Sequence, residues 1–275
     1  MTFRTYNQVE GEDRSGLGAQ VTTQRAKVAA RMRSVKRSVA IMSGKGGVGK
    51  SYVTAGWAAS LATQRTVGVL DADLGSPTVA RLLEAKGPLT MDAAGVHPVL
   101  GRHGVRVMSS DLILDEAQPL GWKGPQQETF VWRGTFSIGV LREMLGDVVW
   151  KDLDVLLIDL PPGADSVKDV MTLHAGLSGV IAVTIPSEES YRSVARALRA
   201  AEDAGAPILG IVENMSGYAC PRCDEVGPLF AGDAGGRLAE TARVPLLGRV
   251  PFRPADAGPP RLPDEVVRRL AEVIA

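Results

Sequence analysis

The chain has 275 residues, 45% of them apolar and 23% charged, and its 31 basic residues balance 31 acidic ones. This length is enough to bury one large sheet, and zero net charge provides no general attraction to nucleic acid or to an anionic membrane surface. We therefore expect neither a nucleic-acid partner nor a membrane partner. The opening residues Met1–Gln20 are polar, and the apolar runs fall far short of the roughly twenty residues that span a bilayer, so we predict a cytoplasmic protein.

The N-terminal part of the chain divides into two segments. Residues 1–19 carry glycines and charges without periodicity, which predicts a flexible N-terminal arm, and residues 20–275 are expected to form a single domain. Residues 19–36 have the pattern of a helix. Within the segment 25–37 there are six basic residues and no acidic one. A solvated helix face is the favoured interpretation of this segment, and a contact with an anion or a partner is the alternative.

Short runs of Val, Ile and Leu alternate with helical patterns along the rest of the chain. Buried strands are predicted at 39–42, 67–70, 105–108, 155–158, 180–183, 208–212 and 246–250. Helices are predicted at about 134–147, 165–176, 189–204, 233–242 and 263–274. This alternation indicates a doubly wound α/β fold, in which a mostly parallel sheet has helices on both faces. Residues 86–104 and 111–130 lack a clear period and predict loops or a small hairpin.

A glycine-rich loop follows the first predicted strand and precedes a helical pattern. Gly44, Gly49, Lys50 and Ser51 satisfy the phosphate-loop pattern G-x-x-x-x-G-K-[ST]. Such a loop directs backbone N–H groups at phosphate oxygens, its lysine reaches the β- and γ-phosphates, and its hydroxyl binds Mg²⁺. The predicted nucleotide-binding residues of this loop are Gly44, Lys45, Gly46, Gly47, Val48, Gly49, Lys50, Ser51 and Tyr52.

Three aspartates follow two of the predicted strands. Asp159 ends the run 155–158, and Asp71 and Asp73 follow the run 67–70. Ligands of parallel α/β sheets bind outside the carboxyl ends of the strands, so these carboxylates are expected beside the phosphate loop. An aspartate at the end of a buried strand is where a carboxylate of the Mg²⁺ shell belongs in a P-loop protein. We therefore predict that Ser51 and Asp159 hold the magnesium ion, and Asp71 is a further candidate beside them.

The two cysteines form a single C-x-x-C pair, Cys220 and Cys223. Two thiolates at this spacing can bind one metal, but Zn²⁺ or a [4Fe–4S] cluster usually takes four thiolates. A symmetric dimer would supply four. We rank iron–sulfur cluster binding first, structural zinc second and a thiol–disulfide redox role third. The predicted metal loop lies near residues 216–227.

Together these stretches resemble the Mrp/ApbC-type iron–sulfur cluster carrier ATPases, a branch of the ParA/MinD class of P-loop ATPases. The resemblance is carried by Ser43–Ser51, Asp71–Thr78, Val131–Gly134, Leu153–Gly163 and Gly205–Gly236, and it covers roughly residues 38–255. It implies slow ATP hydrolysis, a homodimer, and transient holding of a [4Fe–4S] cluster that cluster donors supply and apo-proteins receive.

The resemblance also implies roles for individual residues. Lys45 would reach across the dimer to the partner's nucleotide, Lys50 would bind the phosphates, and Asp73 would position the attacking water, which makes these three the expected catalytic residues. Asp71 would lie in the outer shell of the magnesium ion. Asn214, at the expected end of the strand 208–212, would bind the adenine edge, and Pro251 would line the adenine pocket. The alternative functions are a partitioning or positioning ATPase without a cluster, and a weakly hydrolysing regulatory protein.

Overall fold

The computed structural model describes residues 17–113, 129–254 and 260–275, and the side chains of these residues except 17–21 and 129–137. The strands of its large sheet are β1 (Val35–Ser43), β2 (Val67–Asp71), β5 (Val99–Leu100), β6 (Arg106–Met108), β7 (Leu153–Asp159), β8 (Gly179–Thr184), β9 (Ile208–Ala219), β10 (Val226–Gly227) and β11 (Leu246–Phe252). The helices are α1 (Leu17–Met32), α2 (Lys50–Leu61), α3 (Val79–Leu82), α4 (Thr129–Asp147), α5 (Ser166–Leu173), α6 (Glu188–Asp203), α7 (Ala234–Ala242) and α8 (Asp264–Glu272).

The sheet has nine strands among the described residues, in the order β10-β9-β8-β1-β7-β2-β6-β5, and β11 also pairs with β9. All of these strand pairs are parallel except β10 with β9 and β5 with β6. The predicted α/β class with a mostly parallel sheet is therefore confirmed. The central position of β1 explains why its residues from Ser38 to Ser43 are all buried.

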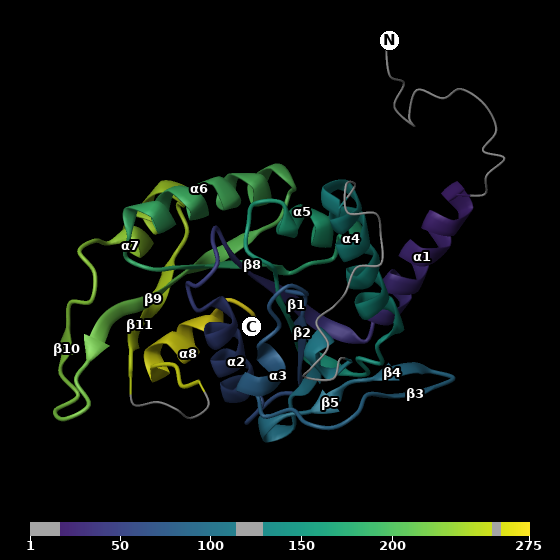
Figure 1. Cartoon of the computed structure of the whole chain (residues 1–275), viewed down its shortest axis with the longest axis horizontal. Helices are drawn as coiled ribbons and strands as arrows, with labels where there is room; N and C mark the ends of the chain where they lie inside the picture. Colours follow the sequence, from purple (N-terminus) through teal and green to yellow (C-terminus); the bar gives the residue numbers. More distant parts are fainter. Residues whose placement is uncertain (1–16, 114–128, 255–259) are drawn as a thin grey trace, which may run out of the picture.

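Helices cover both faces of the sheet, as Figure 1 shows. Alternate residues of β1 belong to different cores: Ala40 and Met42 pack with α1, α4, α5, α6 and α7, whereas Val39 and Ile41 pack with α2, α3 and α8. Successive side chains of a strand point to opposite faces, so the unbroken apolar run predicted for a doubly covered strand is accounted for. Val48, in the loop that follows β1, belongs to the second of these cores.

The basic segment 25–37 is not one helix face. Helix α1 ends at Met32 and β1 begins at Val35, so the predicted helix 19–36 is too long at its C-terminal end. Arg31 donates to the carbonyls of Ala94 and Gly146, and Lys36 pairs with Asp154. Arg31 thus joins α1 to neighbouring segments, whereas Lys36 is largely exposed but lies on β1, so the predicted helix face does not extend to it. The predicted arm lies outside the described residues except for 17–19, which begin α1.

Strand β9 is the largest difference from the predicted boundaries. It runs for 12 residues and continues through Asn214 and Met215 to Ala219, so the prediction that a strand ends at Asn214 is wrong. Pairing with β11 up to Tyr218, and with β10 at Tyr218 and Ala219, extends it past Gly217. The predicted metal loop at 216–227 is correspondingly shorter, because its first four residues belong to the strand.

The remaining elements lie at the periphery. The segment 86–104 contains the predicted small hairpin, formed by β3 (Thr90–Asp92) and β4 (Gly95–His97). Most of the segment 111–130 lies outside the described residues, and α4 begins at Thr129. No helix in the described part of the chain is long and apolar enough to cross a membrane.

Candidate nucleotide site and cysteine turn

The glycine-rich loop joins the carboxyl end of β1 to the first turn of α2. Gly47 and Gly49 have φ values of 77° and 79°, in the left-handed region that residues with a Cβ atom rarely adopt. Gly44 needs a glycine for a different reason, because a Cβ there would lie 2.2 Å from the backbone carbon of Ser193 in α6. The loop therefore requires glycine at these positions, and it ends at a helix N-terminus that favours an anion.

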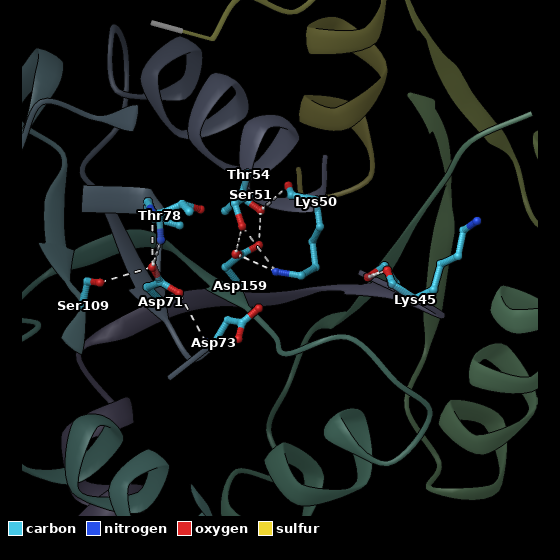
Figure 2. Close-up of polar contacts among 11 residues, drawn as sticks. Lys45, Lys50, Ser51, Thr54, Asp71, Asp73, Thr78, Ser109 and Asp159 are labelled. Atoms are coloured by element: carbon cyan, nitrogen blue, oxygen red, sulfur yellow. Dashed lines mark hydrogen bonds and ion pairs between the residues drawn. The ribbon is translucent and has the colours of Figure 1, made fainter. Parts of the chain in front are cut away.

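Lys50, Ser51 and Thr54 converge on the buried carboxylate of Asp159, the last residue of β7 (Figure 2). One oxygen of Asp159 accepts from Lys50 Nζ at 2.6 Å and from Ser51 Oγ at 2.5 Å. The other oxygen accepts from Thr54 Oγ1 at 2.7 Å. The lysine and the carboxylate are both buried, so this ion pair is shielded from solvent. Thr54 lies one helical turn after Lys50, which is why both side chains reach the same group.

Asp71 is a second buried carboxylate, directly beside the first. It ends β2 and pairs in register with Asp159 on β7. Its oxygens accept from the backbone N–H groups of Asp73, Thr78 and Val79 and from the Ser109 hydroxyl. Burial, and then the negative charge of Asp159, raise the pKa of Asp71 to about 7. The site thus holds two adjacent carboxylates but one buried lysine, an excess of negative charge that a divalent cation would balance.

Lys45 and Asp73 lie at the edges of this cluster. Lys45 is half-buried, and its side chain extends away from Lys50 and Asp159 (Figure 2). Asp73 follows the end of β2 by two residues, is half-buried and lies near Asp71 and Asp159 (Figure 2). The cluster around Asp159 therefore contains Lys50 and excludes Lys45, although both lysines belong to one loop.

Asn214 is tied to the glycine-rich loop. Its buried side-chain amide donates to the carbonyl of Val48 at 2.9 Å. The contact is so close that a Cβ at Gly49 would lie 2.1 Å from the Asn214 amide nitrogen. In the described structure the amide on which we based adenine recognition therefore binds the loop backbone, and its predicted contact with a base stays a prediction.

A charged network holds β9 beside Asn214. The buried Glu213 accepts from the backbone N–H of Gly235 at 2.7 Å, in the first turn of α7, and from Arg249 Nε at 3.2 Å. Arg249 also pairs with Asp233, the N-cap of α7, at 2.6 Å. Since a buried carboxylate is stable only when it is paired and hydrogen-bonded, this network fixes the position of β9 relative to β11 and α7.

Pro251 and Tyr52 are the remaining predicted nucleotide residues. Pro251 is a half-buried residue of β11, whose neighbour Val250 pairs in register with Asn214. The Tyr52 hydroxyl lies 3.3 Å from the backbone nitrogen of Arg261 and 3.4 Å from its carbonyl oxygen. Tyr52 therefore connects the first turn of α2 to the segment that precedes α8.

The cysteines occupy the turn between β9 and β10. Cys220 is half-buried and Cys223 is exposed. The Cys220 N–H donates to the Glu225 carbonyl at 2.9 Å, and the Asp224 N–H donates to the Cys220 carbonyl at 2.8 Å. Asp224 takes the left-handed conformation with φ 60°, which tightens the turn. The backbone N–H groups of Arg222 and Cys223, and the Cys223 thiol, lower the pKa of Cys220 by hydrogen bonding to its sulfur.

The surroundings of the turn are open and charged. A cavity of about 510 Å³ adjoins both cysteines and Arg253. Arg253 pairs with Asp224 and so links the turn to the end of β11. No group of three or more potential His, Cys, Asp or Glu metal ligands occurs among the described residues. Among the described residues, the turn of one chain therefore provides two thiolate ligands for a metal.

A match to a known family identifies the class of protein to which the chain belongs. A ParA family model described as NUBPL iron-transfer P-loop NTPase matches residues 34–259. The chain belongs to this family. The family resemblance inferred from the sequence is therefore confirmed, and the glycine-rich loop, called the phosphate loop below, carries the sequence motif typical of P-loop NTPases.

Curated relatives agree with this assignment over most of their length. An iron–sulfur cluster carrier protein from Saccharolobus solfataricus is 38% identical over 262 residues, which cover 92% of this chain and 85% of the relative. One from Methanocaldococcus jannaschii is 39% identical over 233 residues, covering 83% of this chain and 77% of the relative.

Solved structures give the same fold. A nucleotide-binding protein from Archaeoglobus fulgidus, in complex with ADP and with Co found by PIXE, has a TM-score of 0.69 and 34% identity. The match covers 91% of this chain and 92% of that one. The septum site-determining protein MinD from Pyrococcus horikoshii, complexed with Mg-ADP, has a TM-score of 0.51 at 20% identity, covers 85% of this chain and 86% of that one, and shows the fold alone.

The structure brings most of the predicted nucleotide residues together and keeps the cysteines apart from them in a separate turn. Sequence reasoning missed Thr54, Ser109 and the network of Glu213 with Arg249 and Asp233. The spacing of four residues from Lys50 could have identified Thr54, and its position after a strand could have identified Ser109. The network joins residues from distant parts of the sequence and gives no local signal.

Proposed function

We propose that the protein is an ATP-hydrolysing carrier that holds a [4Fe–4S] cluster between two copies of the chain and passes it to apo-proteins. The observation that carries this proposal is the turn 220–225. It presents two free thiols toward solvent, stabilises the thiolate of Cys220 through backbone N–H groups, and lies at the end of the strand that contacts the phosphate loop. The names of the curated relatives support the same cargo.

The residues of the loop fit a magnesium nucleotide. The loop's N–H groups and Lys50 would hold the phosphates, and Ser51, Asp71 and Asp159 would hold Mg²⁺ directly or through water. Burial and the neighbouring Asp159 raise the pKa of Asp71 to about 7, so ionisation of this carboxyl is unfavourable, and a nearby cation would relieve that cost. When bound, the magnesium ion supplies charge that neutralises the phosphate oxygens. Adenine recognition is assigned to Asn214 and Pro251.

Hydrolysis depends on Asp73 and the two lysines. Asp73 stands at the carboxyl end of β2, where a half-buried carboxylate can orient a water toward the phosphates. Lys50 is directed into its own site by Asp159. Lys45 extends away from that site, which is the geometry that a lysine acting on the nucleotide of a second copy requires. Positioning and charge stabilisation of this kind are the main contributions of proteins to phosphoryl transfer.

The cluster is cargo in this scheme. Two copies of the turn would supply four thiolates, the number that a [4Fe–4S] cluster usually takes. Delivery is then an exchange of ligands, in which each iron–sulfur bond to the carrier is replaced by one to the recipient. No electrons change hands. An exposed thiol such as Cys223 is accessible to the incoming ligand.

Anaerobic reconstitution tests the cargo. The metal-free protein is incubated with iron, sulfide and a thiol reductant, and the visible absorption, the iron and sulfide content and the molecular mass are measured. We expect one cluster per two chains, and no cluster with Cys220→Ser combined with Cys223→Ser. Glu225→Gln, which alters an exposed side chain of the same turn, is the matched control and should load as the wild type does.

Two outcomes would reject the cluster assignment. The wild-type protein could take up no iron and sulfide, or the double serine variant could take up as much as the wild type. Metal analysis of protein purified without oxygen separates the remaining possibility, because stoichiometric zinc in place of iron and sulfide would make the cysteine pair a structural zinc site.

A further inference from the structure

Strand β9 contacts the phosphate loop at its middle and carries the cysteine turn at its end. Asn214 binds the Val48 carbonyl at 2.9 Å, and Cys220 follows Ala219, the last residue of β9. The Asn214 amide also lies so close to Gly49 that the loop has no room for a Cβ there. A change of backbone conformation at Val48 and Gly49 therefore has to move the Asn214 amide or break its hydrogen bond.

A backbone irregularity lies immediately after Asn214. Met215 has φ 52° and is the single non-glycine residue with a positive φ inside a strand of the described chain. The pairing with β11 shifts at the same place, because β9 advances from Asn214 to Tyr218 while β11 advances from Val250 to Phe252. Such a conformation is unfavourable for a residue with a side chain and persists only where its surroundings impose it. The Asn214 contact with the loop is made by the residue immediately before Met215.

Beyond Met215, the end of β9 and the cysteine turn are joined as one unit. Tyr218 pairs with Phe252 of β11 and with Gly227 of β10. The turn is closed by its own backbone hydrogen bonds, and the ion pair of Asp224 with Arg253 ties it to the end of β11. A rearrangement at Met215 would consequently move the turn as a body and leave its internal geometry unchanged.

We propose that Asn214 is a positioning residue that couples the two sites: nucleotide at the loop draws the Asn214 amide away from Val48, and the released end of β9 gives its cysteines greater exposure. This inference rests on the proposed nucleotide binding and is independent of which metal the cysteines hold. A ligand can shift such an equilibrium only through a difference in its affinity for the two states. A base that binds the Asn214 amide in a position from which the Val48 carbonyl is out of reach supplies that difference.

The rate of thiol alkylation measures the coupling without any cluster. The metal-free, reduced wild-type protein is treated with iodoacetamide with and without saturating Mg-ADP, occupancy is verified by equilibrium dialysis, and the labelled cysteines are counted by mass spectrometry. We expect Mg-ADP to raise the rate about fivefold or more, the lower end of typical coupling between sites. An unchanged or lower rate with the nucleotide bound would overturn the inference.

Three variants test the route. In Asn214→Ala the rates with and without bound Mg-ADP should become equal. Met215→Gly keeps the Asn214 side chain and accepts the left-handed conformation without strain, so it should bind ADP within about threefold of the wild type but lose most of the rate difference. Ser216→Ala is the matched control in the same strand and should keep the full effect. A full wild-type effect in Asn214→Ala would exclude Asn214 as the coupling residue, and a full effect in Met215→Gly would exclude β9 as the route.

These outcomes are distinguishable from failure of the proposed function. A protein that loads a cluster but shows no effect of Mg-ADP on alkylation retains the carrier role and loses the coupling. A protein that shows the effect but takes up no iron and sulfide retains the coupling and loses the cargo.

Discussion

The phosphate loop and the cysteine turn hold their functional groups in opposite ways. Around the loop, Lys50 and Asp159 are buried and hydrogen-bonded to each other at the centre of the sheet. At the edge of the same sheet, Cys223 is exposed, and the ion pair that supports the turn, Asp224 with Arg253, is open to solvent. The charged groups of the first region are held in place by burial. The thiols of the second region are held by the backbone hydrogen bonds of a short turn.

This difference matches the chemistry that each region is proposed to perform. Phosphoryl transfer benefits from charges that are already in position when the reaction begins, and burial provides that. Transfer of a cluster requires ligands that can be exchanged, so the thiols have to be reached from solvent. The same kind of substitution should therefore have unequal effects in the two regions.

Removing the buried lysine should have the largest effect. Lys50→Ala leaves the Asp159 carboxylate buried without its charge partner, which costs about 3–5 kcal/mol in the free energy of unfolding. Nucleotide affinity should fall at least about 100-fold because a charge-assisted phosphate contact is lost. Urea denaturation and calorimetric titration with Mg-ADP measure the two quantities. Lys45→Ala in the same loop should change stability by less than about 0.5 kcal/mol, and tight nucleotide binding by Lys50→Ala would contradict the loop assignment.

Neutralising Asp71 should change how stability depends on pH. Its folded pKa of about 7 lies above the ordinary value of 3.8, so between these values the folded protein binds more protons than the unfolded chain. The free energy of unfolding consequently falls as pH rises from about 4 to 7, by at most about 4 kcal/mol.

Asp71→Asn should lack this fall while keeping an acceptor for Ser109. Urea denaturation of both proteins in metal-free buffer at pH 5 and pH 8 gives the comparison, and the variant should gain stability relative to the wild type at pH 8. Identical pH dependence in the two proteins would show that the Asp71 carboxylate is not destabilised.

Replacing the outward-directed lysine should affect turnover alone. Lys45→Ala should bind Mg-ADP as the wild type does, and its rate of ATP hydrolysis should fall about 100-fold if its charge stabilises the transition state in a second copy. Steady-state phosphate release measures the rate. The Lys50→Ala variant keeps Lys45 but is expected not to bind nucleotide. Adding an excess of Lys50→Ala to Lys45→Ala should therefore restore part of the hydrolysis activity. An unchanged hydrolysis rate in Lys45→Ala would argue against this role.

Removing the exposed cation at the cysteine turn should have the smallest effect. Arg253→Ala breaks an ion pair whose side chains are 39% and 69% exposed, so the loss of stability should be below about 1 kcal/mol. Urea denaturation of Arg253→Ala and Lys50→Ala gives the two losses of stability, which compares an exposed ion pair with a buried one. A loss as large as that of Lys50→Ala would mean that the turn is integrated with the core.

The sequence was sufficient for the parts of the site that depend on local patterns. The positions of Lys50 and Ser51 follow from the loop motif, and that of Asp159 follows from its place at the end of an apolar run. The two-sided core also follows from the sequence, because a strand covered on both faces has to be apolar throughout.

Strand β9 could not be predicted in the same way. Ser216 and Gly217 read locally as the beginning of a turn, yet pairing with two neighbouring strands extends β9 to Ala219. Methionine has no preference for the left-handed conformation that Met215 adopts, and it is imposed by tertiary contacts. The bond from Asn214 to Val48 joins residues 166 positions apart, a separation at which propensity and spacing carry no information.

That separation has a consequence for biosynthesis. The glycine-rich loop leaves the ribosome early. Asn214, which hydrogen-bonds to the loop, is made 166 positions after Val48, about 10–30 s later at ordinary rates of translation. Strand β1, which precedes the loop, also lacks its pairing partners at that stage, because β7 and β8 come from the second half of the chain. Cys220 is made only six positions after Asn214. In a nascent chain the native contacts of the phosphate loop therefore form at about the time when the cysteines are synthesised. We expect the two sites to fold together, after most of the chain has been made.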